Sequence, residues 1–157
     1  MWWTDERHFQ MGFQLLELLI ATAIVAVLAF IAIPGYSNYR DKVNNAIAVA
    51  DINNIDQAIE RFYQENNSYP DILTDVKKGD LLDPWKHQYL YLRIAGANLK
   101  GKGAQRKDKN LVPINSDYDL YSMGKDGASV SPLTAKVSRD DIVRAYNGKY
   151  IGLAAYF

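Results

Sequence analysis

The chain has 157 residues, with 18 basic and 18 acidic side chains, so its formal net charge at pH 7 is zero. This balance gives no electrostatic reason to expect nucleic acid or an acidic substrate as the main partner. There is no cysteine, which excludes disulfides and thiolate metal sites, and the two histidines make a zinc site or a catalytic triad hard to assemble.

Residues 13–33 (FQLLELLIATAIVAVLAFIAI) are the most apolar stretch of the chain and contain one charged residue, Glu17. A helix of about 20 residues spans about 30 Å, the thickness of the hydrocarbon core of a bilayer. The alternative is a buried core helix, but a small soluble domain could hardly cover it on all sides. The stretch therefore predicts a membrane-spanning helix. No small-residue cleavage site follows it, so it is expected to stay on the mature chain.

Glu17 lies near the start of this apolar stretch. A carboxylate in hydrocarbon costs about 2.5–3.5 kcal/mol at mid-helix on insertion scales, which suggests a function. If the chain were cut before Phe13, the new α-ammonium of one subunit and Glu17 of a neighbour could neutralise each other in a packed bundle. The alternative is a glutamate that reaches the membrane interface of a simple anchor.

The segment GFQLLEL, residues 12–18, resembles the type IV prepilin signature. In that family a membrane peptidase cuts after the glycine, N-methylates the new phenylalanine and requires glutamate at the fifth mature position. The resemblance implies cleavage between Gly12 and Phe13 and an assembly role for Glu17. Pro34 stands where the family often has a proline. The chain differs in having Gln14 where threonine is common, and a leader without a basic excess.

Helical periodicity resumes after Pro34 and Gly35. Apolar residues recur there three or four positions apart, at Ala48, Ile52, Ile55, Ile59 and Phe62. This pattern predicts one long helix over residues 13–64, kinked near Pro34, whose second half packs on a small soluble domain. The expected organisation is a leader (1–12), a transmembrane and polymerisation helix (13–34) and a periplasmic globular domain (35–157).

The rest of the chain predicts short strands and loops. Residues 71–86 have the composition of a loop. Alternating residues indicate a strand over 87–94, and further strands are expected over 117–123 and within 146–157. The fold class is therefore α+β and pilin-like, a long helix on a small antiparallel sheet. Residues 100–110 carry five basic residues without interleaved aromatic residues, which favours a solvated loop over a nucleic-acid site. These are Lys100, Lys102, Arg106, Lys107 and Lys109.

Three segments of the soluble half resemble the major pseudopilin of type II secretion systems. They are residues 63–70 (YQENNSYP), residues 83–85 (DPW) with Tyr89, and residues 119–127 (DLYSMGKDG) followed by 140–142 (DDI). That pseudopilin binds calcium. The resemblance implies as ligands the backbone carbonyl of Met123 and the carboxylates of Asp126, Asp140 and Asp141. From the residues alone, solvated loop aspartates are the alternative. The connection 127–139 is longer than is usual in the family, and residues 148–157 extend beyond its usual end.

The resemblance implies a structural subunit of a pseudopilus that drives protein export by type II secretion. Such a subunit is stored in the inner membrane as a single-pass protein with a periplasmic domain, and then forms a periplasmic homo-oligomeric filament. The implied partners are the prepilin peptidase, minor pseudopilins and the inner-membrane assembly platform. The sequence contains no catalytic constellation, so an enzyme is not expected. Two alternatives stay open: a type IV pilin for adhesion, motility or DNA uptake, and a monomeric signal-anchored periplasmic binding or enzymatic domain.

Overall fold

The computed structural model describes residues 7–109 and 111–157, and for residues 7–13 it describes the backbone only. The chain forms two compact units, Met1–Asp41 and Lys42–Phe157, and each is described by itself. Helix α1 (Arg7–Asn66) contributes residues to both units. It begins six residues before the predicted start at 13 and continues through Pro34. A continuous helix can still bend, so the kink near Pro34 stays a prediction.

In the first unit, the described side chains of α1 are almost all exposed. Over residues 14–33, the large apolar residues with more than half of their surface exposed are Leu15, Leu16, Leu18, Leu19, Ile20, Ile24, Val25, Val27, Leu28, Phe30, Ile31 and Ile33. Within the described part of the chain, α1 is the one helix long and apolar enough to cross a membrane, and none of its most apolar stretch is buried. A helix that is apolar all round needs a covering of lipid or protein. This unit therefore has the properties of a membrane anchor.

The second unit contains a four-stranded antiparallel sheet. Its strands are β1 (Leu90–Arg93), β2 (Tyr118–Ser122), β3 (Ile142–Ala145) and β4 (Tyr150–Leu153), and they lie in the order β1-β2-β3-β4. Between α1 and β1 there is a short 3-10 helix, η1 (Leu73–Val76). Two further short 3-10 helices, η2 (Lys136–Ser138) and η3 (Ala154–Tyr156), lie before β3 and after β4. The α+β prediction is confirmed.

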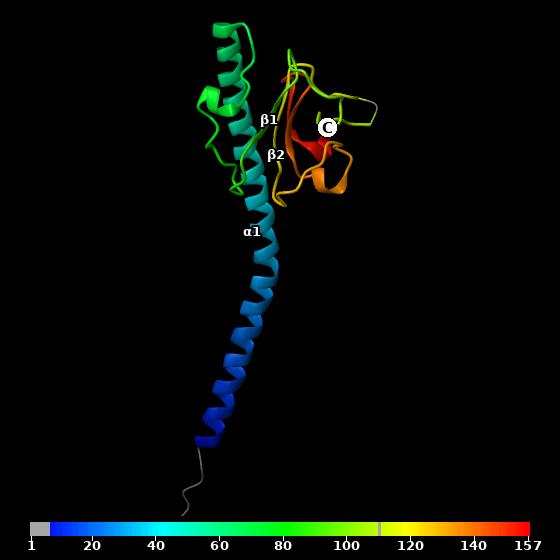
Figure 1. Ribbon diagram of the computed structural model, residues 1–157. Coiled ribbons are helices and arrows are strands. Elements are labelled where there is room, and N and C mark those ends of the chain that lie inside the picture. Colours follow the sequence, from blue (N-terminus) through cyan, green and yellow to red (C-terminus); the bar gives the residue numbers. More distant parts are fainter. Residues whose placement is uncertain (1–6, 110) are drawn as a thin grey trace, which may run out of the picture. The chain divides into compact units, whose positions relative to one another are not determined.

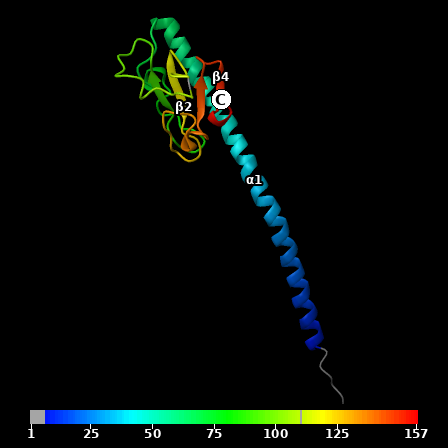
Figure 2. The same cartoon turned by 90° about the vertical axis from the view of Figure 1, so that its right-hand side faces the viewer.

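The larger of the two buried apolar clusters of this unit lies between the sheet and the part of α1 after Lys42, and these elements lie side by side in both views (Figures 1 and 2). Four members of the predicted apolar stripe are fully buried: Ala48, Ile52, Ile55 and Ile59. They pack with residues of the sheet, including Tyr118, Leu120 and Ile142. Phe62, the fifth member, is only partly buried because it lies close to the helix end.

Strands β1, β2 and β4 lie inside the predicted ranges 87–94, 117–123 and 146–157, but β3 was not predicted. All four residues of β3 are buried, so the strand lacks the alternation of a half-exposed strand. The sequence also places a charged residue, Arg144, within it and two aspartates directly before it. Charged residues in so short a segment are typical of a loop. The groups that pair with them in the fold come from distant segments of the chain.

Ile55→Ala is expected to lower the free energy of unfolding by about 2–5 kcal/mol, because Ile55 is fully buried in this core. Thermal unfolding of the full chain in detergent, followed by circular dichroism, measures the change. Ile47→Ala on the same helix is the matched control, because Ile47 is 46% exposed. Equal unfolding midpoints for the two variants would contradict the packing of the stripe on the sheet.

Candidate functional site

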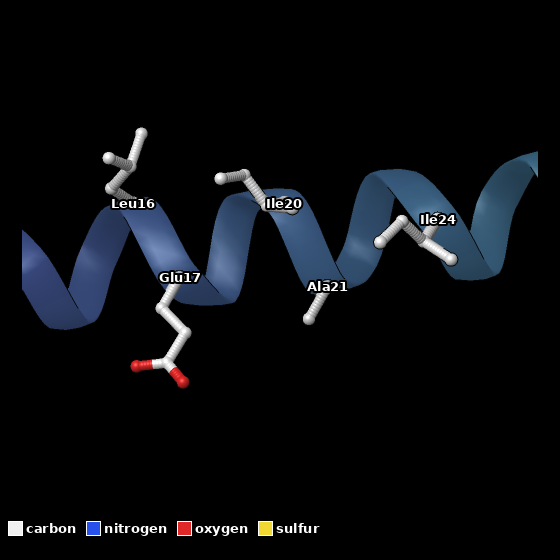
Figure 3. Close-up of a pocket in the computed structure, with 5 residues that line it drawn as sticks. All are labelled: Leu16, Glu17, Ile20, Ala21 and Ile24. Atoms are coloured by element: carbon white, nitrogen blue, oxygen red, sulfur yellow. The ribbon is translucent and has the colours of Figure 1, made fainter.

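Glu17 lies in a shallow groove on the surface of α1, lined also by Leu16, Ile20, Ala21 and Ile24. Figure 3 shows Glu17 and Ala21 on one side of the helix and Leu16 and Ile20 on another. Within the described part of the chain, Glu17 has neither a hydrogen bond nor an ion pair. The groove thus combines one unpaired carboxylate with apolar side chains. It is suited to another apolar helix that brings a positive charge.

The predicted processing residues Gly12 and Phe13 lie within α1. Residues 1–6 of the predicted leader and the side chain of Phe13 lie outside the described residues, so cleavage between Gly12 and Phe13 stays a prediction. Glu17 follows Phe13 by four residues, about one helical turn and about 6 Å along the axis. An amine at Phe13 of one subunit would therefore come beside the carboxylate of Glu17 of a neighbour when the two helices are offset by about one turn along the axis.

The structure brings together two of the predicted calcium ligands, Asp126 and Asp140. The backbone N–H of Asp126 donates to Oδ2 of Asp140 at 3.1 Å. The turn that follows Met123 packs directly on Asp140, since a Cβ added to Gly124 would lie 2.2 Å from the Asp140 carbonyl oxygen. Gly124 has a φ of 65°, which also favours glycine at this position. The loop after β2 is thus held closely against residue 140.

The carboxylate of Asp141 is fully buried and has other partners. Its Oδ2 forms an ion pair with Nη2 of Arg106 and accepts a hydrogen bond from Ser129 Oγ at 2.6 Å. Its Oδ1 is buried without a hydrogen-bond partner among the described residues. Burial raises the pKa of Asp141 to about 6, although Ser129 and Arg106 act to lower it.

These positions test whether the predicted donor set fits a calcium ion. Calcium takes six to eight oxygen ligands, usually with several carboxylates. Within residues 7–109 and 111–157, no three acidic or histidine side chains lie close enough together to hold a metal ion. As placed, the set does not fit, because its carboxylates do not form such a group of three and Oδ2 of Asp141 is paired with Arg106, which leaves only Oδ1 of Asp141 without a partner. Calcium binding stays a prediction from the resemblance.

The sequence analysis placed Arg106 in a solvated basic loop, and this assignment was wrong. Arg106 is 2% exposed, whereas Lys100, Lys102 and Lys109 of the same loop are exposed. The only indication in the sequence that residue 106 is buried is that it is an arginine and not a lysine. A guanidinium makes several hydrogen bonds in a fixed plane and is less strongly hydrated than an ammonium, so arginine is the cation more often found inside proteins.

A second buried cation, Arg144 of β3, was not singled out by the sequence analysis. Its Nη2 lies 2.7 Å from Oδ2 of Asp117, its Nε forms an ion pair with Asp56 of α1, and its guanidinium lies 3.9 Å from the ring centre of Tyr118. The hydroxyl of Tyr118 donates to Asp56 at 2.6 Å. Burial alone would lower the pKa of Arg144, but the hydrogen bond to Asp117 and the nearby acids raise it above its usual value. This cluster joins α1 to the sheet within the second unit.

Comparison with known proteins gives relatives for nearly the whole chain. No family model matches, and no solved structure matches significantly. The chain is 33% identical over 154 residues to the type IV major fimbrial protein FimA of Dichelobacter nodosus, covering 92% of this chain and 88% of that protein.

Relatives that are described as a type II secretion protein also match. The type II secretion system core protein G of Pectobacterium carotovorum subsp. carotovorum is 34% identical over 124 residues, which covers 75% of this chain and 78% of that protein. The protein of the same description from Escherichia coli (strain K12) is 27% identical over 140 residues, covering 85% of this chain and 89% of the relative. The matched lengths are too great to lie within the apolar helix alone.

Proposed function

The chain belongs to the type IV pilin-like family, and from this membership we propose that it is the structural subunit of a pseudopilus that drives protein export by type II secretion. One observation carries the mechanism. Over residues 14–33, α1 exposes apolar side chains on all sides and has a single charged residue, Glu17, without a partner in the described chain. A lone subunit can keep such a helix in a bilayer, and a filament can cover it with copies of itself.

The proposed storage and assembly of the subunit follow from the two environments of α1, which are lipid before assembly and neighbouring subunits after it. In the inner membrane, lipid covers the apolar side chains of a single-pass helix, and the globular unit lies on the periplasmic side. The prepilin peptidase cuts between Gly12 and Phe13 and methylates the new amine. That amine pairs with Glu17 of a neighbouring subunit, so that both charges are neutralised as the helices leave lipid and pack together.

The proposed partners are those of a growing filament. Further copies of the chain form its body, minor pseudopilins join it, and the inner-membrane assembly platform adds subunits. Growth needs an energy source outside this chain, a separate assembly ATPase. No enzymatic role is assigned, in keeping with relatives that are described as a fimbrial protein and a secretion core protein.

Mass spectrometry of the native chain tests processing directly. We expect the mature protein to begin at Phe13 with one methyl group on its amine. In Gly12→Val, the added side chain at the cleavage position should block the cut, so that the chain keeps residues 1–12. A native chain that still begins at Met1 would contradict the proposal and favour a monomeric signal-anchored periplasmic domain.

A type IV pilin is the second candidate, favoured by the 33% identity to a fimbrial protein over 92% of this chain. Deletion of the gene separates the two functions. If the chain is a pseudopilus subunit, its deletion should leave folded exoproteins trapped in the periplasm, with no loss of surface fibres. Normal secretion together with lost surface filaments, adhesion or motility would establish the pilin instead.

A further inference from the structure

Arg106 lies at the centre of a buried polar cluster that none of the proposed filament contacts uses. Its Nη1 donates to Ser129 Oγ at 2.6 Å and to the Val130 carbonyl at 2.7 Å, and its Nη2 pairs with Asp141. The guanidinium also lies 4.2 Å from the ring centre of Tyr121 in β2. We name Arg106 and these four partners the Arg106 cluster. One side chain thus contacts β2, the residue before β3 and the connection 127–139.

The backbone around Arg106 is joined to the same segments. The N–H of Arg106 donates to Oδ2 of Asp119 in β2 at 2.7 Å, and its carbonyl accepts from the N–H of Ile114 at 3.0 Å. The N–H of Lys107 donates to the Ser131 carbonyl at 3.1 Å, and the N–H of Leu133 donates to the Lys107 carbonyl at 2.9 Å. The position of Arg106 is therefore set by the backbone, not only by its own long side chain.

The charges of this region require a buried cation. Asp119 and Asp141 are both fully buried, and Arg106 contacts both of them: its backbone N–H donates to Asp119, and its guanidinium pairs with Asp141. Taking an ionised carboxylate out of water is costly unless it is paired and hydrogen-bonded. Two of the groups that pair with Arg106, Ser129 and the Val130 carbonyl, belong to the connection that is longer than is usual in the family. The connection 127–139 thus provides partners for the guanidinium.

We infer that Arg106 is an internal cation of this chain and holds the loops around Asp141 in the way that the family resemblance assigns to a bound calcium ion. The inference rests on the donor set, because Oδ2 of Asp141 is paired with Arg106 and the described residues contain no group of three acidic or histidine side chains that could hold a metal ion. The fold of the second unit should then depend on Arg106 and not on calcium. This conclusion is independent of whether the filament is a pseudopilus or a pilus.

Thermal unfolding of the full-length chain in detergent tests the inference with calcium itself as the probe. In the wild type we expect the same midpoint in EDTA and in calcium at about 5 mM, which exceeds the ~0.1–1 mM Kd of weak extracellular calcium modules. Arg106→Met should lower the midpoint by at least ~10 °C, because it leaves the buried carboxylate of Asp141 without its cation, and calcium should not restore it.

Three further variants make the result specific. Lys100→Ala removes the same charge from an exposed position of the same loop and should leave the midpoint unchanged. Asp141→Asn combined with Arg106→Met should lower the midpoint by less than the sum of the single changes, because the two side chains form one pair. If Arg106→Met fails to fold, Arg106→Lys replaces it, since a lysine keeps the charge but not the planar fork, and should lower the midpoint measurably.

Two results would overturn the inference. One is a wild-type midpoint that rises by several degrees with calcium and falls again with EDTA. The other is an Arg106 variant, with methionine or lysine, that unfolds at the same temperature as the wild type and Lys100→Ala.

Discussion

Glu17→Ala is expected to leave the chain in the inner membrane and to reduce filament assembly by about 100-fold or more. Removing one partner of a buried ion pair costs about 3–5 kcal/mol, and each 1.4 kcal/mol is tenfold in an equilibrium constant. Insertion should not suffer, because the variant removes the charged residue from residues 13–33 and makes α1 a more apolar membrane helix. Shearing and sedimentation of filaments, beside membrane fractionation of the same cells, measure both quantities.

Two substitutions at the same position separate charge from shape. Glu17→Gln keeps the size of the side chain and should fail like alanine, because the partner amine keeps its charge. Glu17→Asp keeps the charge with a shorter reach and should retain part of the assembly. Leu19→Ala, on the same exposed helix, is the control for a lost apolar side chain. A normal yield of filaments from Glu17→Ala or Glu17→Gln would refute the pairing of Glu17 with a neighbouring amine.

Arg144→Met is expected to lower the free energy of unfolding of the second unit by about 3–5 kcal/mol, the usual effect of breaking a buried ion pair. The side chain is 2% exposed and pairs with both Asp117 and Asp56, so its loss leaves two carboxylates facing each other without a cation. It also removes the contact with the ring of Tyr118. Denaturant unfolding of the full chain in detergent, followed by tyrosine fluorescence, gives the value.

The matched control is Arg93→Met, which removes an arginine from β1. Arg93 pairs with Asp71 at 2.7 Å, but 82% of the Asp71 side chain is exposed, so the pair should contribute less than about 1 kcal/mol. An Arg144 variant as stable as the Arg93 variant would show that the buried cluster does not hold α1 to the sheet.

The sequence predicted those elements whose pattern is repeated along the chain. The stretch 13–33 is largely apolar, with Glu17 as its one charged residue, and the stripe from Ala48 to Ile59 is periodic, so the long helix and its buried face were predicted correctly. Glu17 was identified by contrast, as one charge among apolar neighbours. Strands β1 and β2 lie within their predicted ranges, but neither has an alternating burial pattern: all four residues of β1 are partly buried, and four of the five residues of β2 are buried.

The missed features depend on partners distant in the sequence. Arg106 and Arg144 look like ordinary surface arginines until the fold places Asp141 and Asp117 beside them. Strand β3 was missed for the same reason, since Arg144 is inside it and can be buried only with its acids. Polar residues in a core carry no periodic signal, because their burial is decided by hydrogen-bond partners and not by their own hydrophobicity.

The ion pair between Asp56 and Arg144 also determines when the second unit can finish folding during synthesis. The two residues are 88 positions apart, and the hydrogen bond from Tyr118 to Asp56 spans 62 positions. Contacts of such long range form late. The ribosome must therefore complete almost the entire polypeptide before β3 can cover Ile52 and Ile55. Until then the newly made stripe is incompletely covered, and loss of the last strands by truncation would leave an aggregation-prone, protease-sensitive product.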